Sequence, residues 1–190
     1  HNIEVKKPFK VMTMKESLKK YADMDIDTLD DKELKKELDK NKIRYNKFSR
    51  GIAMQLLFEG LVEDKLIQPT FITDHPIETT PLCKPTKNDN NLIERFELFI
   101  CGFELSNAYS ELNNPLLQRK LLEDQSKQLK QGNEEANPMD DDFLESIETG
   151  MPPTGGVGIG IDRMAMVLLG KDSIKDVILF PFMKSFKNNE

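Results

Sequence analysis

The chain has 190 residues, of which 38% are hydrophobic, and its formal net charge is −6. This length supports one domain with a core and some appendage, and the acidic balance gives no overall basic surface for nucleic acid. The only cysteines, Cys83 and Cys101, are too few for a disulfide framework and favour a reducing compartment, the cytoplasm. No apolar run approaches the ~18 residues that cross a bilayer, so we expect no membrane partner.

The first half of the chain predicts a strand followed by three helices. The strand falls within residues 3–12, and Thr13-Met14-Lys15-Glu16 has the pattern of a capping box that opens the first helix. A charged helix is expected over 32–42, and Ser49 can cap a longer one. That helix carries an apolar stripe expected in the core, formed by Ile52, Ala53, Leu56, Leu57, Leu61, Val62 and Leu66. A buried strand is predicted over 69–73.

The second half predicts more strands and an acidic helical segment. Residues 94–109 indicate two strands joined by a tight turn at Cys101-Gly102. Residues 116–149 hold nine acidic and four basic side chains, and we expect two helices there, forming an insertion within a domain that spans 1–190. A last buried strand is expected over 177–180.

The most informative stretch is Gly156-Val157-Gly158-Ile159-Gly160-Ile161-Asp162-Arg163. Period-two alternation predicts a strand, with Val157, Ile159 and Ile161 anchored in a core and a glycine face free of side chains. A bare face lets a ligand or another backbone approach closely. Residues 164–169 then predict a buried helix that ends at Gly170. Arg163 falls where strand becomes helix, and its planar fork suits phosphate. Close packing alone, with a solvated arginine, is the other interpretation.

Two carboxylates face each other if Cys101-Gly102 is a two-residue turn. Phe99 then pairs with Glu104, so Glu97 becomes the diagonal neighbour of Glu104. Two like charges at this spacing are destabilising unless something neutralises them, and phosphate-bound Mg²⁺ is suited to that role. The alternative is that both carboxylates are solvated on an exposed sheet face.

A second polar set follows by alternation along the same strand. Asn107, Tyr109 and Glu111 share one face and offer an amide, a phenol and a carboxylate. This set could bind an amine-bearing small molecule. Ordinary chemistry at the edge of a sheet would give the same pattern.

Five stretches then stand together: Ile67-Gln68-Pro69-Thr70-Phe71-Ile72, Pro81-Leu82, Glu94-Arg95-Phe96-Glu97, Asn107-Ala108-Tyr109-Ser110-Glu111-Leu112-Asn113 and Gly158-Ile159-Gly160-Ile161-Asp162-Arg163. In order and spacing they resemble the lysyl-tRNA synthetases of class II. The last stretch resembles the widely shared motif 3. The resemblance implies an α+β fold with an antiparallel sheet flanked by helices. It also implies that ATP and lysine react to lysyl-adenylate, and that the lysyl group passes to tRNA(Lys).

The resemblance also assigns roles around ATP. Glu97 and Glu104 would hold Mg²⁺ that bridges the phosphates. Arg163 would clamp ATP, and Gly160 would lie under it. Catalysis would then rest on Glu97, Glu104 and Arg163 through positioning and electrostatic stabilisation.

A second group of residues would bind lysine. Asn107, Tyr109, Glu111 and Gly158 would line its pocket, and Glu111 is the candidate partner of the ε-ammonium. Simple alternation places Glu104 and Asn107 on opposite faces, whereas the resemblance uses both in one site. We therefore predict a bulge or twist near Leu105-Ser106.

Parts of the family pattern have no counterpart in these 190 residues. Motif 1, which forms the family's dimer, motif 2 and the anticodon-binding barrel are not found. The chain is therefore expected to be the C-terminal part of a catalytic domain, inactive alone, whose complete protein is a homodimer. A related ligase that attaches a lysine-like amino acid to a protein and a non-catalytic synthetase-derived module are the alternatives.

Overall fold

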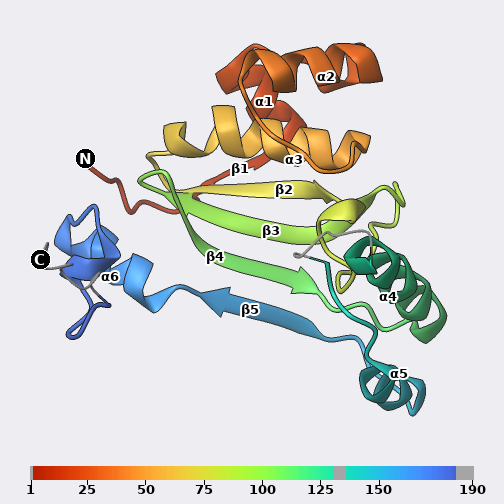
Figure 1. Cartoon of the computed structure of the whole chain (residues 1–190). Coiled ribbons are helices and arrows are strands. Elements are labelled where there is room, and N and C mark those ends of the chain that lie inside the picture. Colours follow the sequence, from red (N-terminus) through yellow and green to blue (C-terminus); the bar gives the residue numbers. More distant parts are fainter. Residues whose placement is uncertain (1, 131–135, 183–190) are drawn as a thin grey trace, which may run out of the picture.

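The computed structural model of the chain describes residues 2–130 and 136–182. A five-stranded mixed sheet in the order β1-β2-β3-β4-β5 carries α1, α2 and α3 on one face (Figure 1). The strands are β1 (Lys10–Thr13), β2 (Thr70–Pro76), β3 (Leu92–Ile100), β4 (Phe103–Ser110) and β5 (Gly155–Ile159). The helices are α1 (Met14–Ala22), α2 (Asp31–Lys40), α3 (Arg50–Leu61), α4 (Pro115–Lys130), α5 (Asp141–Glu148) and α6 (Ile161–Leu169). Short 3-10 helices are η1 (Ile26–Thr28), η2 (Glu63–Lys65), η3 (Ile77–Thr79) and η4 (Ile174–Asp176). The predicted α+β class is confirmed.

One strand pair departs from a purely antiparallel sheet. β1 runs parallel to β2, with Lys10 opposite Thr70, whereas β2 to β5 are antiparallel to their neighbours. Parallel strands need a long crossover, and α1 to α3 supply it. The same helices therefore cover one face of the sheet.

The helix starts follow the predicted caps. The backbone N–H of Glu16 donates to Thr13 Oγ1 at 3.1 Å, and the N–H of Thr13 donates to Glu16 Oε2 at 2.8 Å. This reciprocal pair is the predicted capping box. In α3 the N–H of Ile52 donates to Ser49 Oγ at 3.2 Å, which confirms the second cap.

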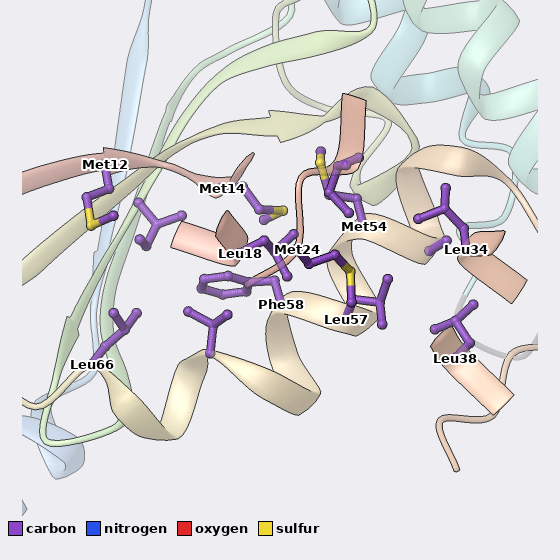
Figure 2. Packing of buried hydrophobic residues seen from close by; sticks show 14 of the residues in the cluster. Met12, Met14, Leu18, Met24, Leu34, Leu38, Met54, Leu57, Phe58 and Leu66 are labelled. Atoms are coloured by element: carbon purple, nitrogen blue, oxygen red, sulfur yellow. The ribbon is translucent and has the colours of Figure 1, made fainter. Parts of the chain in front are cut away.

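The core lies between the sheet and α1 to α3 (Figure 2). The Phe58 ring of α3 meets the Phe99 ring of β3 edge-on, with centroids 5.4 Å apart. Of the predicted stripe, Ala53, Leu57, Val62 and Leu66 are buried, and Ile52, Leu56 and Leu61 are partly buried. The apolar stripe predicted for this helix therefore lies mainly in the core.

The hairpin between β3 and β4 has the predicted turn. Cys101 and Gly102 both have positive φ, 58° and 76°, as a two-residue turn of type I′ requires. Phe99 pairs with Glu104, but Leu98 pairs with Ser106. Leu105 is thus an extra residue in β4, and the predicted bulge near Leu105-Ser106 is confirmed.

The predicted burial at the C-terminal end is wrong. Val157 and Ile159 are 68% and 54% exposed, because no element among the described residues covers that side of β5. Ile161, the first residue of α6, is 65% exposed. In α6 only Met166 is buried, whereas Leu168 is 77% exposed.

The last predicted strand is also wrong. Residues 177–180 form none, because no described strand offers them a ladder of hydrogen bonds, and Leu179 and Phe180 are almost fully exposed. Helix α6 does end at Gly170, with a left-handed φ of 62°, as predicted.

Both helices predicted in the acidic segment are present as α4 and α5, between β4 and β5 in the chain. Arg119 of α4 pairs with Asp141 and Glu148 of α5 at 3.4 and 3.2 Å. The Gln118 side-chain amide donates to the Pro81 carbonyl at 2.9 Å and ties α4 to the loop before β3. None of the described helices is long and apolar enough to cross a membrane.

A buried histidine lies where β2 changes register. Asp74 has a positive φ of 58°, and His75 beside it is fully buried, with Nε2 3.2 Å from the Ile72 carbonyl oxygen. Burial, helped by the nearby Arg95 guanidinium, lowers the pKa of His75 to about 4. The folded state therefore holds this ring neutral.

The His75 pKa predicts acid sensitivity. The unfolded imidazole binds its proton near pH 6.5 and the folded one only near pH 4, so His75 lowers stability as the pH falls between these values. The full loss is about 3 kcal/mol. Urea unfolding at steps from pH 7 to 4.5 should show a smaller loss for His75→Gln than for the wild type. Parallel curves would contradict this assignment.

Core packing predicts a large cost for shortening Leu57. Leu57 of α3 is fully buried in the core, and shortening its side chain to a methyl group should lower the free energy of unfolding by about 2–5 kcal/mol. Leu116→Ala is the matched control, because Leu116 is 80% exposed, and it should cost under about 1 kcal/mol. Urea denaturation of both variants measures the difference, and equal losses would contradict the packing described.

Candidate functional site

Two adjoining cavities bring most of the predicted residues together. One, of about 940 Å³, lies between α3 and the sheet and is lined by Arg95, Glu97 and Glu104 among others. The other, of about 360 Å³, is lined in part by Glu104, Asn107, Gly158, Gly160 and Arg163. Glu104 lines both cavities, so the two spaces meet at its carboxylate.

Glu97 is a buried carboxylate on the helix-covered face of β3. It pairs across the ladder with Asn107, and only 5% of the residue is exposed. Burial raises the pKa of Glu97 to about 7; the Arg95 guanidinium, which ion-pairs with it, acts in the opposite direction, and Glu104 adds to the rise. This burial rules out the alternative that Glu97 is a solvated surface acid.

Arg163 contacts the second carboxylate. Its Nη1 donates to the Glu104 carbonyl at 2.6 Å and lies 3.3 Å from Glu104 Oε2. Arg163 lies in the first turn of α6, and Gly160 is the residue directly before that helix. The Gly160 N–H donates to the Leu105 carbonyl at 2.9 Å. The end of β5 is thereby tied to the bulge in β4, and half of the arginine side chain stays exposed.

The glycine face of β5 lies on the site side of the sheet. Gly158 pairs with Asn107 and Gly156 with Tyr109. A Cβ on Gly156 would stand 2.4 Å from Glu111 Oε1, so the carboxylate occupies the space that this glycine leaves. The bare strand face therefore makes room for side chains of β4 and for a ligand.

Tyr109 lies farther along β4, and Glu111 follows the end of that strand. Neither cavity described above is lined by Tyr109 or Glu111. Burial raises the pKa of Glu111, and burial together with the Glu111 charge raises the pKa of Tyr109. These two side chains form a region next to the Glu97 cluster, at the end of β4 and just beyond it.

Three charged residues near the site were not predicted. Arg95 bonds to both Glu97 and Asn107, and Glu59 and Glu63 border the acidic pair. Burial raises the pKa of Glu63, and the charges of Glu59 and Glu104 add to this. Alternation along β3 could have found Arg95, which is two residues from Glu97, but nothing local in the sequence brings α3 to this face.

The donor set suits a cation that phosphates help to hold. Among residues 2–130 and 136–182, no three or more His, Cys, Asp and Glu side chains gather as a metal cage. Glu97 and Glu104 are nevertheless diagonal neighbours on one face, and Mg²⁺ is commonly bound by one or two carboxylates plus substrate phosphates. The two carboxylates therefore fit Mg²⁺ that arrives with a nucleotide.

The chain is similar to known proteins over nearly its whole length. The chain is 48% identical over 187 residues to a lysine--tRNA ligase of Saccharolobus solfataricus, covering 97% of this chain and 38% of that protein. It is 51% identical over 184 residues to lysine--tRNA ligase 2 of Methanosarcina mazei, covering 96% of this chain and 36% of that protein. The chain thus spans little more than a third of the relatives it matches. The family model of the class II tRNA synthetases (D, K and N) matches residues 1–184, and the chain belongs to that family.

Proposed function

We propose that this chain is part of the catalytic domain of a lysine--tRNA ligase. The reaction joins the lysine carboxylate to the α-phosphate of ATP and releases pyrophosphate, after which the lysyl group passes to the 3′ end of tRNA(Lys). The observation that carries the proposal is the placement of Glu97, Glu104 and Arg163 on one sheet face, next to the glycines of β5. The similarity to named lysine--tRNA ligases supports lysine as the amino acid.

The acidic pair would bind the nucleotide's cation. Mg²⁺, when bound, neutralises charge that develops on the phosphates. Glu97 supplies a buried, pre-oriented carboxylate from β3, and Glu104 supplies a partly exposed one from β4. Their mutual repulsion is reduced by Arg95 and Arg163, and a cation between them would reduce it further.

Arg163 would bind the phosphates or adenine of ATP. Half of its side chain is exposed beside Glu104, so one face of the guanidinium is open to a ligand. Gly160 and Gly158 would let the substrates lie close to the backbone. Because these donors are fixed before substrate arrives, little reorganisation would oppose the reaction.

Lysine would extend along β4. Asn107 lies beside the acidic pair, and Tyr109 and Glu111 follow toward Gly156. Glu111 would pair with the ε-ammonium, because a partly buried carboxylate discriminates against a neutral or shorter side chain. The carboxylate end of lysine would then point toward the ATP phosphates.

The remaining assignments concern the complete protein. We infer that it is a cytoplasmic homodimer, that it recognises tRNA through parts outside these residues, and that α4 and α5 form a solvated insertion. The net negative charge of the 116–149 segment argues against direct phosphate contact there. The protein-lysylating ligase and the non-catalytic module stay the competing functions.

Lysine-dependent exchange of pyrophosphate into ATP tests the function. The full-length protein should catalyse exchange only with lysine present, whereas the 190-residue chain alone should be inactive. Aminoacylation of tRNA(Lys) by the active protein then distinguishes the tRNA ligase from a protein-lysylating one. Folded full-length protein without exchange would contradict lysine activation and favour the non-catalytic module.

The contact between Gly156 and Glu111 predicts a selective defect. Gly156→Ala should push the Glu111 carboxylate aside and raise the KM for lysine about tenfold or more, with the KM for ATP nearly unchanged. Gly155→Ala is the matched control, because its Cβ would meet only the Tyr109 carbonyl oxygen at 3.8 Å. Glu111→Gln should reproduce the defect. Equal lysine KM values in both glycine variants would exclude Glu111 from the pocket.

A further inference from the structure

Arg95 stands between the two parts of the candidate site. It lies on β3 two residues before Glu97 and opposite Tyr109 of β4, and its side chain is only 13% exposed. Its Nη2 donates to Glu97 Oε1, and its Nε donates to Asn107 Oδ1 at 3.1 Å. One planar group therefore binds a carboxylate proposed for the nucleotide's cation and an amide proposed for lysine.

The guanidinium is itself held in place. Its third nitrogen, Nη1, lies 3.5 Å from Thr79 Oγ1, and that hydroxyl donates to the Pro76 carbonyl at 2.7 Å. Thr79 belongs to η3, which directly follows β2. A residue outside the β3–β4 hairpin thus helps to hold the Arg95 guanidinium, so its orientation does not depend on Glu97 and Asn107 alone.

Arg95 also decides which way the Asn107 amide points. A guanidinium carries only donors, so the group that faces Nε must be the amide oxygen. The Asn107 NH₂ is consequently turned away from Arg95, and Asn107 lines the cavity that Gly158 and Arg163 also line. Asn107 is therefore presented to a ligand as a donor, which suits a carboxylate or phosphate oxygen.

We propose that Arg95 is a positioning residue. It couples Glu97, the carboxylate assigned to the nucleotide's cation, to Asn107, the amide assigned to lysine. The proposal rests on the proposed function, because it names what the site's two halves bind. Because one guanidinium holds both side chains, a shift of the Glu97 carboxylate would also shift the Asn107 amide. The affinity for lysine and the requirement for Mg²⁺-ATP then become linked, and such a linkage is reciprocal.

The test is Arg95→Lys in the full-length protein, with steady-state pyrophosphate exchange measured across lysine, ATP and Mg²⁺ concentrations. Lysine at this position keeps the positive charge but cannot bind two groups as a planar fork does. We expect the KM for lysine and the Mg²⁺ concentration for half-maximal rate both to rise about tenfold or more. Arg119→Lys is the matched control, because the ion pairs of Arg119 within the described part of the chain are with Asp141 and Glu148 of α5, and it should leave both values within about twofold.

A second variant tests the amide orientation without removing the fork. Asn107→Asp keeps an oxygen for Arg95 but replaces the NH₂ donor with an acceptor. It should raise the KM for lysine about tenfold or more, because the NH₂ donor is lost. An unchanged lysine KM in this variant overturns the assigned orientation, even if Arg95→Lys does not fold.

The outcomes separate the two proposals. A wild type without lysine-dependent exchange contradicts the proposed function, and the coupling falls with it. An active wild type whose Arg95→Lys variant changes only one of the two dependences overturns the coupling alone. The Arg95→Lys variant could also give less folded protein while the folded fraction keeps the wild-type lysine KM and Mg²⁺ dependence. Arg95 would then have a purely structural role, and the coupling would be overturned.

Discussion

One extra residue in β4, Leu105, sets the geometry of the candidate site. Side chains alternate between the faces of a strand, so a regular β4 would place Glu104 and Asn107 on opposite faces. The bulge returns both to the face of Glu97, because Phe99 pairs with Glu104 while Glu97 pairs with Asn107. Gly160 then donates to the Leu105 carbonyl, which ties the start of α6, and with it Arg163, to the same point.

The helical layer gives this face its second property, which is burial. The contact between Phe58 and Phe99 fixes α3 against the hairpin. Glu59 of α3 and Glu63 of the following η2 thereby come near the acidic pair. Water is thereby reduced around Glu97, whose pKa rises to about 7 mainly through burial. A buried carboxylate of this kind is costly unless it has a partner, and Arg95 provides one until a cation arrives.

Much of this arrangement could be predicted from short-range chemistry. The turn at Cys101-Gly102 and the cap at Thr13 each follow from a few neighbouring residues, whereas the bulge near Leu105 was predicted only because the family resemblance uses Glu104 and Asn107 in one site. The parallel pairing of β1 could not be predicted, since it depends on how three helices fold back along the sheet. Burial of Val157 was predicted wrongly because alternation gives the two faces of a strand but not which of them is covered. Alternation along β3 puts Arg95 on the face of Glu97, but its contact with Asn107 depends on the register that places Asn107 opposite Glu97, and the sequence does not give this register.

The central claim is that Glu97 and Glu104 bind a nucleotide through its cation, next to the glycine face of β5. The most direct measurement is the affinity of the full-length protein for ATP by calorimetry, with Mg²⁺ and with chelator, in the wild type and in Glu97→Gln/Glu104→Gln. The account predicts tight binding only for the wild type with Mg²⁺, and weak, Mg²⁺-independent binding for the variant. Equal ATP affinity in all four experiments would contradict it.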